Sequence, residues 1–188
     1  MLELENALIV EVVNSFKKWS SQDLKVLAIN KENINDALWF NTQEEINQFQ
    51  HFIDKGYLGF YCYKNGICIF RTFIFTKSEK AMVGKHFAYH LKENEVFSAW
   101  NQTAKEYRGL GVYSFTLNQL IHMFPDKHFS AFVSADNHSS IKGMKKAGFE
   151  ITRRLILMKL SRLKIYIQYK GPNNKWCFRL GIGSIINK

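Results

Sequence analysis

The apolar positions along this chain follow two different periods, and the change between them predicts where helices and strands lie. Residues 6–18 have apolar positions at helical spacing, which predicts an amphipathic helix with an apolar side made of Leu8, Ile9, Val12, Val13 and Phe16. The stretch FNTQEEINQFQHFIDKG predicts a second helix, because Asn41 or Thr42 suits its N-cap and Gly56 suits its end.

The pattern then changes to that of strands. The stretch YLGFYCYKNGICIFRTFIF consists of two aromatic and β-branched runs joined by an Asn-Gly pair at 65–66, which predicts a two-residue β-hairpin. In that hairpin Tyr63 would face Cys68, and Cys62 would face Ile69. Further strands are predicted at HFAYHL and EVFSAWNQT.

Helices and strands alternate in the next part of the chain. Residues 112–124 carry an apolar stripe that stops at Pro125, so they predict a helix. The strand HFSAFVSA follows, and DNHSSIKGMKKAGF predicts a short helix with Asp136 or Asn137 as N-cap and Gly148 as stop. EITRRLILMKLSRLKIYIQYK predicts a last strand that runs into a basic amphipathic segment, and the final GPNNKWCFRLGIGSIINK is left unassigned. This order predicts an α/β fold with a mixed sheet and a right-handed strand–helix–strand unit around residues 95–135.

Length and charge narrow the class of protein. The 188 residues suit one domain, and 46% hydrophobic with 15% aromatic residues indicates a globular chain. The net charge of +10 indicates an acidic partner, which can be phosphate, a nucleotide, nucleic acid or an anionic membrane surface. The aromatic runs are better explained as hairpin core than as a platform for stacking bases, so we expect no nucleic-acid partner.

The cysteines and the N-terminal stretch indicate a reduced protein without a metal. Cys62, Cys68 and Cys177 show no Cys-x-x-Cys spacing and no nearby His cluster, so no metal site is expected. The stretch MLELENALIVEVV lacks the basic flank of a signal peptide, and no stretch approaches the ~20 apolar residues that span a bilayer. We therefore expect a cytoplasmic protein.

The stretch EYRGLGVYS joins a predicted strand to a predicted helix. A helix start exposes unpaired backbone N–H groups and a partial positive charge, so it can bind an anion. Gly109 and Gly111 would let the backbone approach a phosphate, and Arg108 would add a charged donor. The stretch lacks the third glycine of a Rossmann loop and the Gly-Lys-Ser/Thr of a Walker A loop. Alone, it fits either a phosphate loop or an ordinary turn with an exposed arginine.

A second block lies downstream, as Asn137-His138-Ser139-Ser140 and then Lys146-Ala147-Gly148-Phe149. The two blocks together resemble the GCN5-related N-acetyltransferase (GNAT) family. Its members carry Arg/Gln-x-x-Gly-x-Gly/Ala between a strand and a helix and, further along, Asn-x-x-Ala/Ser before a short helix that closes in Gly-Phe. The resemblance covers residues 40–155. It implies a single-domain GNAT-like α/β fold, whose mixed, mostly antiparallel sheet has splayed central strands and is flanked by helices. We expect that domain over residues 1–160 and a basic C-terminal extension over residues 161–188.

The resemblance also implies a co-substrate. Acetyl-coenzyme A would lie between EVFSAWNQT and HFSAFVSA, with its pyrophosphate on the N–H groups of residues 109–114 and its pantetheine arm along the first of these strands. No metal is implied. The implied contact residues are Asn101, Gln102, Thr103, Arg108, Gly109, Leu110, Gly111, Val112, Tyr113, Ser114, Asn137, Ser139 and Ser140.

Two positions depart from the family pattern. Tyr113 stands where the family usually has Gly or Ala, and we expect its ring to turn outward from the phosphate loop. Met144 stands seven residues after Asn137, where many members have a tyrosine that protonates the departing thiolate. Either Tyr113 or water would then be the acid, or none is needed, because a coenzyme A thiolate is a reasonable leaving group.

The general base has three candidates. Glu95 opens the strand before the loop, in a register that looks like that of the glutamate base of histone-acetylating relatives. The alternative is a solvated glutamate at a strand end. His86 and His90 are further candidates, because their spacing puts them on one face of a predicted strand.

The sequence therefore predicts an acetyl-CoA-dependent N-acetyltransferase that transfers the acetyl group directly to a small primary amine. A nucleotide-linked amino sugar is the preferred acceptor. The alternatives are a peptide or protein amine as acceptor, and a non-catalytic GNAT-like protein that binds acyl-CoA. The basic C-terminal segment is read either as a solvated face or as a peripheral contact with an anionic membrane. A homodimer is also considered.

Overall fold

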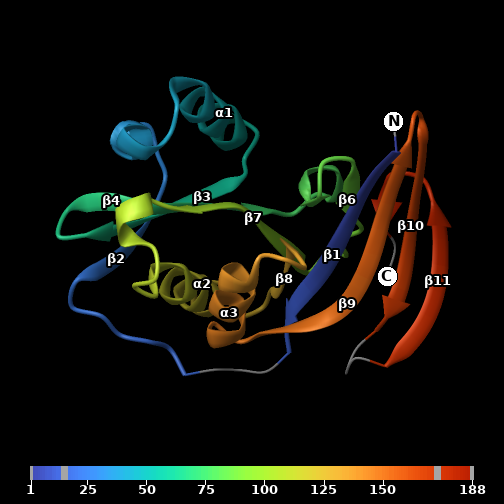
Figure 1. Ribbon diagram of the computed structural model, residues 1–188. Coiled ribbons are helices and arrows are strands. Elements are labelled where there is room, and N and C mark those ends of the chain that lie inside the picture. The colour runs from blue at the N-terminus through green and yellow to red at the C-terminus, as the bar shows by residue number, and fades with distance from the viewer. Residues whose placement is uncertain (1, 14–16, 172–174, 187–188) are drawn as a thin grey trace.

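A computed structural model describes residues 2–13, 17–171 and 175–186. Helices lie on both faces of a central sheet (Figure 1). In chain order the elements are β1 (Leu2–Val12), β2 (Leu24–Ala28), the 3₁₀ helix η1 (Ile34–Phe40), α1 (Gln43–Asp54), β3 (Leu58–Lys64), β4 (Ile67–Phe75), η2 (Ser78–Lys80), β5 (Met82–Val83), β6 (Phe87–Tyr89), β7 (Glu95–Thr103), η3 (Lys105–Tyr107), α2 (Val112–Met123), β8 (His128–Ser134), α3 (His138–Lys146), β9 (Phe149–Leu160), β10 (Leu163–Lys170), β11 (Trp176–Ile182) and β12 (Ile185–Ile186).

The main sheet is mixed and mostly antiparallel. Over the described ranges its strand order is β11-β10-β9-β1-β8-β7-β4-β3-β2. Only β7 and β8 among these neighbours are parallel, and α2 connects them, as predicted for residues 95–135. Figure 1 shows α1 on one face of the sheet, with α2 and α3 on the other. This arrangement confirms the predicted α/β class.

The predicted helix over residues 6–18 is wrong, because β1 occupies residues 2–12 and lies between β8 and β9. The run Ala7–Val10 is buried on both faces of the sheet. Leu8 packs with α2 and α3, whereas Ile9 packs on the opposite side. A short apolar run that is buried on both faces carries no period, so helix and strand cannot be told apart from it. Phe16, which we assigned to that helix, lies outside the described residues.

The second predicted helix and the hairpin are confirmed. Thr42 caps α1 in a capping box, because its Oγ1 accepts the Glu45 N–H at 3.2 Å and Glu45 Oε2 accepts the Thr42 N–H at 2.9 Å. The hairpin turns at 65–66, where both residues have positive φ, and Tyr63 faces Cys68. Cys62 faces Phe70 rather than Ile69, because the register shifts by one residue at that point.

The parallel pair at the centre of the sheet opens partway along. Pairing of β7 with β8 runs from Glu95 opposite His128 to Ser98 opposite Ala131, although β7 continues to Thr103. On its other side β7 stays paired with β4, but with an irregularity that leaves Trp100 at a φ of +58°. A positive φ is strained for a non-glycine residue, so the surrounding structure must hold it.

Arg71 on β4 holds this irregularity. The residue is only 4% exposed, and its guanidinium donates to the Trp100 carbonyl at 2.6 Å. It also donates to Asn41 Oδ1 at 2.6 Å and forms an ion pair with Glu45 Oε1 at 2.9 Å. The guanidinium carbon lies 4.8 Å from the centre of the Phe49 ring. Arg71 therefore links α1 to the point where β7 leaves β8.

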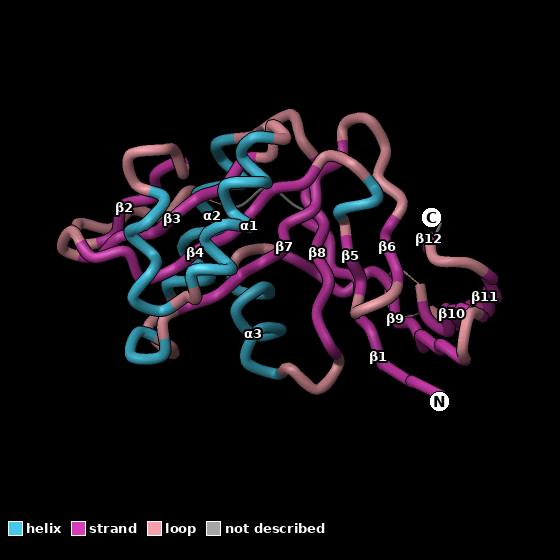
Figure 2. Tube along the Cα trace, turned by 90° about the horizontal axis from the view of Figure 1, so that it is seen from above, coloured by secondary structure: helices cyan, strands magenta, loops and turns pink. Residues whose placement is uncertain are grey.

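The C-terminal part continues the sheet. The last predicted strand is confirmed as β9, and the basic segment after it forms β10. The final stretch, which was left unassigned, contains β11, which pairs with β10. A small sheet of order β12-β6-β5 lies beside this end of the molecule and packs on one face of β1, β9 and β10 (Figure 2). The strand predicted at HFAYHL is β6. The division of the chain at residue 160 stays a prediction.

Candidate functional site

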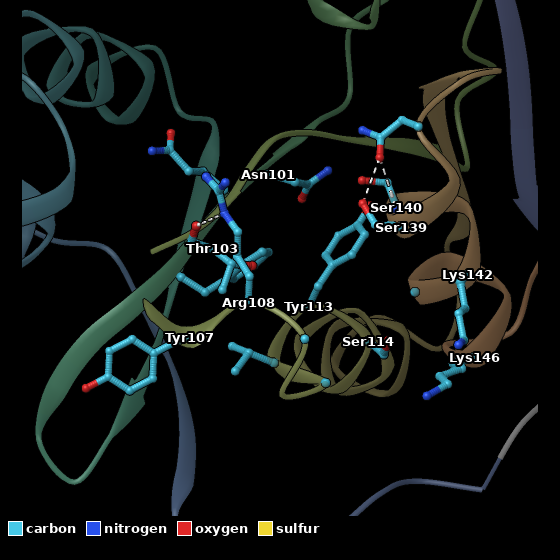
Figure 3. Close-up of a pocket in the computed structure, with 17 residues that line it drawn as sticks. Asn101, Thr103, Tyr107, Arg108, Tyr113, Ser114, Ser139, Ser140, Lys142 and Lys146 are labelled. Carbon is cyan, nitrogen blue, oxygen red and sulfur yellow. Dashed lines mark hydrogen bonds between the residues drawn. The ribbon is translucent and has the colours of Figure 1, made fainter. Parts of the chain in front are cut away.

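A cavity of about 550 Å³ lies where β7 leaves β8, between the first turns of α2 and α3. Figure 3 shows side chains from β7, α2 and α3 pointing toward this space. The predicted contact residues all line the cavity except Leu110, whose side chain is exposed. The residues that the sequence reasoning missed are Phe70, Tyr107, Lys142, Gly143 and Lys146.

The loop before α2 has the backbone of an anion site. Gly109 and Gly111 have φ of +81° and +79°, which only glycine adopts readily. A Cβ at either position would meet no atom within 4 Å, so the loop borders open space. Gly111 is the N-cap of α2 without a side-chain cap, so the first N–H groups of the helix remain to be satisfied by something else.

Arg108 is held at the edge of the cavity. Its Nε donates to the Thr103 carbonyl at 3.2 Å, which fixes the guanidinium over the end of β7. Gln102 also lines the cavity, but its amide donates to the Phe40 carbonyl at 3.1 Å and accepts from Arg71. Gln102 therefore supports the wall, whereas Arg108 leaves guanidinium donors for a ligand.

The opposite wall is the start of α3. Asn137 caps this helix, because its Oδ1 accepts the Ser140 N–H at 3.1 Å and the Ser139 hydroxyl at 3.0 Å. The Asn137 amide nitrogen is then the group of this side chain that can donate to a ligand. Lys142 and Lys146 are one helical turn apart and add two ammonium groups. Their i, i+4 spacing after the Asn block is the signal that could have identified them.

A second cavity of about 440 Å³ adjoins the first. Its lining is mostly apolar and includes Phe97, Phe132 and Met144. Asn101, Tyr113, Asn137 and Ser140 line both cavities, so the two meet at these side chains. One space is rich in hydrogen-bond donors, and the other is apolar.

The expectation that the Tyr113 ring turns outward is wrong. The ring points between β7 and α3 (Figure 3) and lines both cavities. It packs on Phe70, with ring centres 5.7 Å apart. A Cβ on Gly143 would lie only 2.9 Å from its Cδ1, so the glycine makes room for the ring. Burial raises the pKa of the Tyr113 phenol well above its usual value, so the phenol stays protonated near neutral pH.

The three predicted bases do not line either cavity. Glu95 is buried at the first position of β7, where its carboxylate accepts the Lys92 N–H at 2.9 Å. His86 lies 2.9 Å from Glu3 Oε2 in a separate cavity of about 260 Å³, and His90 is exposed beyond β6. The role of each as a base stays a prediction that its position does not favour. In the described ranges no group of three or more His, Cys, Asp or Glu side chains could hold a metal ion.

Comparison with known proteins identifies the fold. No protein-family model matches the chain, and no curated protein matches it in sequence. Among solved structures, an acetyltransferase of the GNAT family from Colwellia psychrerythraea is 13% identical with a TM-score of 0.60, over 83% of this chain and 56% of that chain. The yncA protein of Salmonella typhimurium, solved with acetyl-CoA, is 15% identical with a TM-score of 0.51, over 86% and 92%. AAC(6')-Ib, solved with paromomycin and acetyl-CoA, is 11% identical with a TM-score of 0.56, over 75% and 95%.

The chain therefore has the GNAT fold, which the paired sequence blocks predicted. It spans 56%, 66% and 62% of the lengths of three of the similar structures. Those proteins are longer than this chain.

Proposed function

We propose that this chain is an acetyl-CoA-dependent N-acetyltransferase that acts directly on the primary amine of a small molecule. The observation that carries the proposal is the pairing of two cavities at the opening of β7 from β8. One is lined by a glycine loop, a helix start and cationic side chains, and the other is apolar. A molecule with phosphates at one end and an acyl thioester at the other matches both.

The residues present fit coenzyme A. Gly109 and Gly111 open the backbone toward the cavity, and the N–H groups at the start of α2 suit a diphosphate. Arg108, Lys142 and Lys146 supply positive charge for the phosphates. Past Ser98, β7 has no pairing with β8, so its backbone can pair with the amides of a pantetheine arm.

Acetyl-CoA would supply an activated thioester whose carbonyl carbon an amine can attack. The C–N bond forms as the C–S bond breaks, and the amine loses one proton while the thiolate takes one. The Tyr113 phenol is protonated and lines both cavities, so it is the acid candidate for the thiolate. Met144 lines the apolar cavity and cannot act as an acid.

Neither cavity is lined by an Asp, Glu or His side chain among the described residues. The acceptor would therefore lose its proton to solvent, and only the neutral amine would react. Below the pKa of the amine, kcat/KM should rise about tenfold for each pH unit, because the neutral fraction rises by that factor. A break in this slope at a pH well below the pKa of the amine would instead reveal a base supplied by the protein.

The net charge of the chain supports one class of acceptor. The chain carries +10, so an acceptor with its own phosphates is favoured over a basic peptide. A nucleotide-linked amino sugar combines a primary amine with a diphosphate. A location in the cytoplasm belongs to the same proposal, because nucleotide sugars and acetyl-CoA are both available there.

A second candidate function is a non-catalytic acyl-CoA-binding protein. It is favoured by Met144 at the position of the usual acid and by cavities without a carboxylate or an imidazole. Both candidate functions require binding of acyl-CoA, but only the N-acetyltransferase would transfer the acyl group to an amine.

The test is calorimetric titration with acetyl-CoA, followed by thiol release with a panel of amines. The panel contains nucleoside-diphosphate-linked amino sugars, simple amino sugars and short peptides. Binding with thiol release on the nucleotide-linked amines is expected. Binding without release from any amine would establish the second candidate. Absence of acetyl-CoA binding would overturn both.

A further inference from the structure

One face of the β1–β9–β10–β11 end of the sheet is apolar and uncovered. We call it the outer face, since the small sheet packs on the other one. Side chains at every second position of a strand point to the same face of the sheet, and cross-strand pairing aligns those of neighbouring strands. On the outer face they form three rows that run across the strands. The rows are Leu2, Leu160 and Leu163; Leu4, Met158, Ile165 and Ile182; and Asn6, Ile156, Ile167 and Leu180.

The outer face is most exposed at its borders, whereas Ile156, Met158, Ile165 and Ile167 at its middle are half-buried. Leu4 is 62% exposed and Ile182 is 74% exposed, whereas Leu155 and Leu157, which point to the small sheet, are buried. The rows contain a single polar residue, Asn6, and no charged one. A contiguous apolar surface over four strands is rare on a monomer and usually marks an interaction site.

The border of the outer face is basic and aromatic. In the row next to Asn6, Arg154 pairs with Lys170, and Arg162 lies in the turn between β9 and β10. Trp176 is 79% exposed at the start of β11, with Lys170 Nζ 4.7 Å from the centre of its ring. Phe178, two residues further on, is 75% exposed. Aromatic and cationic side chains around an apolar centre are typical of surfaces that lie in the interface of a membrane.

We propose that the outer face docks on an anionic lipid surface. The charge of the protein favours this partner, because +10 attracts anionic headgroups and repels a second copy of the same chain. Glu3 and Glu5 alternate with Leu2 and Leu4, so these carboxylates point away from the lipid. Within the described residues no helix is long and apolar enough to cross a bilayer. The inference is independent of the proposed acetyl transfer.

In this orientation α2 and α3 would lie close to the lipid surface. Leu8 and Val10 continue the outer side of β1 and are covered by residues of α2 and α3, including Leu117 and Met144. The outer face is the uncovered continuation of that same side. Docking would therefore bring the α2–α3 side of the molecule next to the headgroups.

Vesicle sedimentation tests this proposal. The full chain is mixed with vesicles of phosphatidylcholine alone or with one part in four of phosphatidylglycerol, at low and physiological salt. Binding to the anionic vesicles is expected, and weaker binding to the neutral ones. The double variant Leu4→Ser, Ile182→Ser should lose at least tenfold in affinity. Its control is Leu38→Ser, Ile67→Ser, which changes two exposed apolar residues at the opposite end of the molecule and should bind as the wild type does.

Charge is tested separately. Arg154→Gln and Lys170→Gln should each weaken binding to anionic vesicles by about fivefold, from the roughly 1 kcal/mol that a basic residue contributes near such a surface. Circular dichroism and thermal unfolding establish that each variant is folded.

Two results would overturn the proposal. The first is equal vesicle binding by the wild type and the Leu4→Ser, Ile182→Ser variant, since both carry the same charge and the attraction would then be electrostatic alone. The second is absence of vesicle binding. If sedimentation velocity then finds a dimer that this variant dissociates, the outer face is an interface between two copies.

Discussion

The centre of the main sheet and its β9–β11 end differ in the groups that they leave uncovered. At the cleft, pairing of β7 with β8 stops at Ser98 and Ala131, so backbone polar groups are left facing a cavity. At the β9–β11 end, neighbouring strands stay paired with one another out to the edge strand β11, and apolar side chains remain exposed on one face. Where strand pairing is interrupted, backbone N–H and C=O groups become available to bind a polar ligand. Where pairing continues and one face of the sheet is uncovered, the side chains of that face form an apolar surface.

The interruption is held by few residues. Trp100 adopts a strained φ, and its carbonyl is fixed by Arg71, whose charge is balanced by Glu45 from α1. At the β9–β11 end all neighbouring strands are antiparallel, with register shifts at Ile9/Val10 and at Gln168/Lys170.

The largest effect is expected from Arg71→Met. It removes a buried cation and leaves Glu45, Asn41 and the Trp100 carbonyl without their donor. Loss of one partner of a buried ion pair costs about 3–5 kcal/mol, and this cost should appear in the free energy of unfolding by urea. Coenzyme A binding should fall together with it. The control Arg179→Met changes an exposed arginine on β11 and should alter stability by less than about 0.5 kcal/mol. Equal free energies of unfolding for the two variants would contradict the proposal that Arg71 stabilises the irregularity in β7.

Arg108→Ala is expected to weaken coenzyme A binding by about tenfold or more. The side chain is exposed and, among the residues that the structure describes, its hydrogen bond is to the Thr103 carbonyl, so stability should hardly change. A charged hydrogen bond to phosphate contributes about 1.5–3 kcal/mol, and 1.4 kcal/mol is a factor of ten. Lys105→Ala removes a neighbouring exposed charge outside the cavity and is the matched control. Calorimetry that gives both variants the same affinity would contradict a phosphate contact by Arg108.

Tyr113→Ala should tighten coenzyme A binding by about fivefold. A ligand that reaches from the first cavity into the second must move the ring, and its contact with Phe70 is worth about 1 kcal/mol. Adenosine 3′,5′-bisphosphate lacks the pantetheine arm, so its affinity should stay the same.

Tyr113→Phe keeps the ring and should bind both ligands as the wild type does, while its acetyl transfer reports on the phenol. A parallel change in both affinities in Tyr113→Ala would show that the ring does not stand in the path of the arm.

The smallest effect concerns the thiols. Burial raises the pKa of Cys62 to about 11 and that of Cys68 to about 12, so neither forms thiolate near neutral pH. Cys177, on the edge strand β11, is partly exposed. In the folded protein, a disulfide reagent at pH 7.5 should therefore label one thiol quickly and the other two only on unfolding. Rapid labelling of all three would mean that the β3–β4 core opens readily.

Local signals in the sequence predicted much of the fold. The Asn-Gly turn, the Thr42 cap and the glycine loop all depend on residues within four positions of one another, so one stretch of sequence suffices to recognise them. Pairing of two such stretches, the glycine loop and the Asn137 block, identified the GNAT fold.

The features that were missed depend on distant parts of the chain. β1 was predicted as a helix because its apolar run is buried by β8, β9 and both layers around them. The inward ring of Tyr113 depends on the absence of a side chain at Gly143. The role of Arg71 depends on a carbonyl 29 residues later in the chain and on Glu45, 26 residues earlier. No periodicity within one element reports such contacts.

The central position of β1 also governs the order in which the chain can fold. Leu2 pairs with Leu160 and Ala7 pairs with Ser134, so the first strand finds its neighbours only after most of the polypeptide has been made. Loops of this length are slow to close, because their entropy must be lost before the contacts form. During synthesis the apolar run Ala7–Val10 would leave the ribosome before β8 and β9 have been made, so it would be exposed to solvent. A chaperone that shields short apolar segments would therefore raise the yield of this protein, and truncation before β9 would leave β1 with β8 on one edge and no strand on the other.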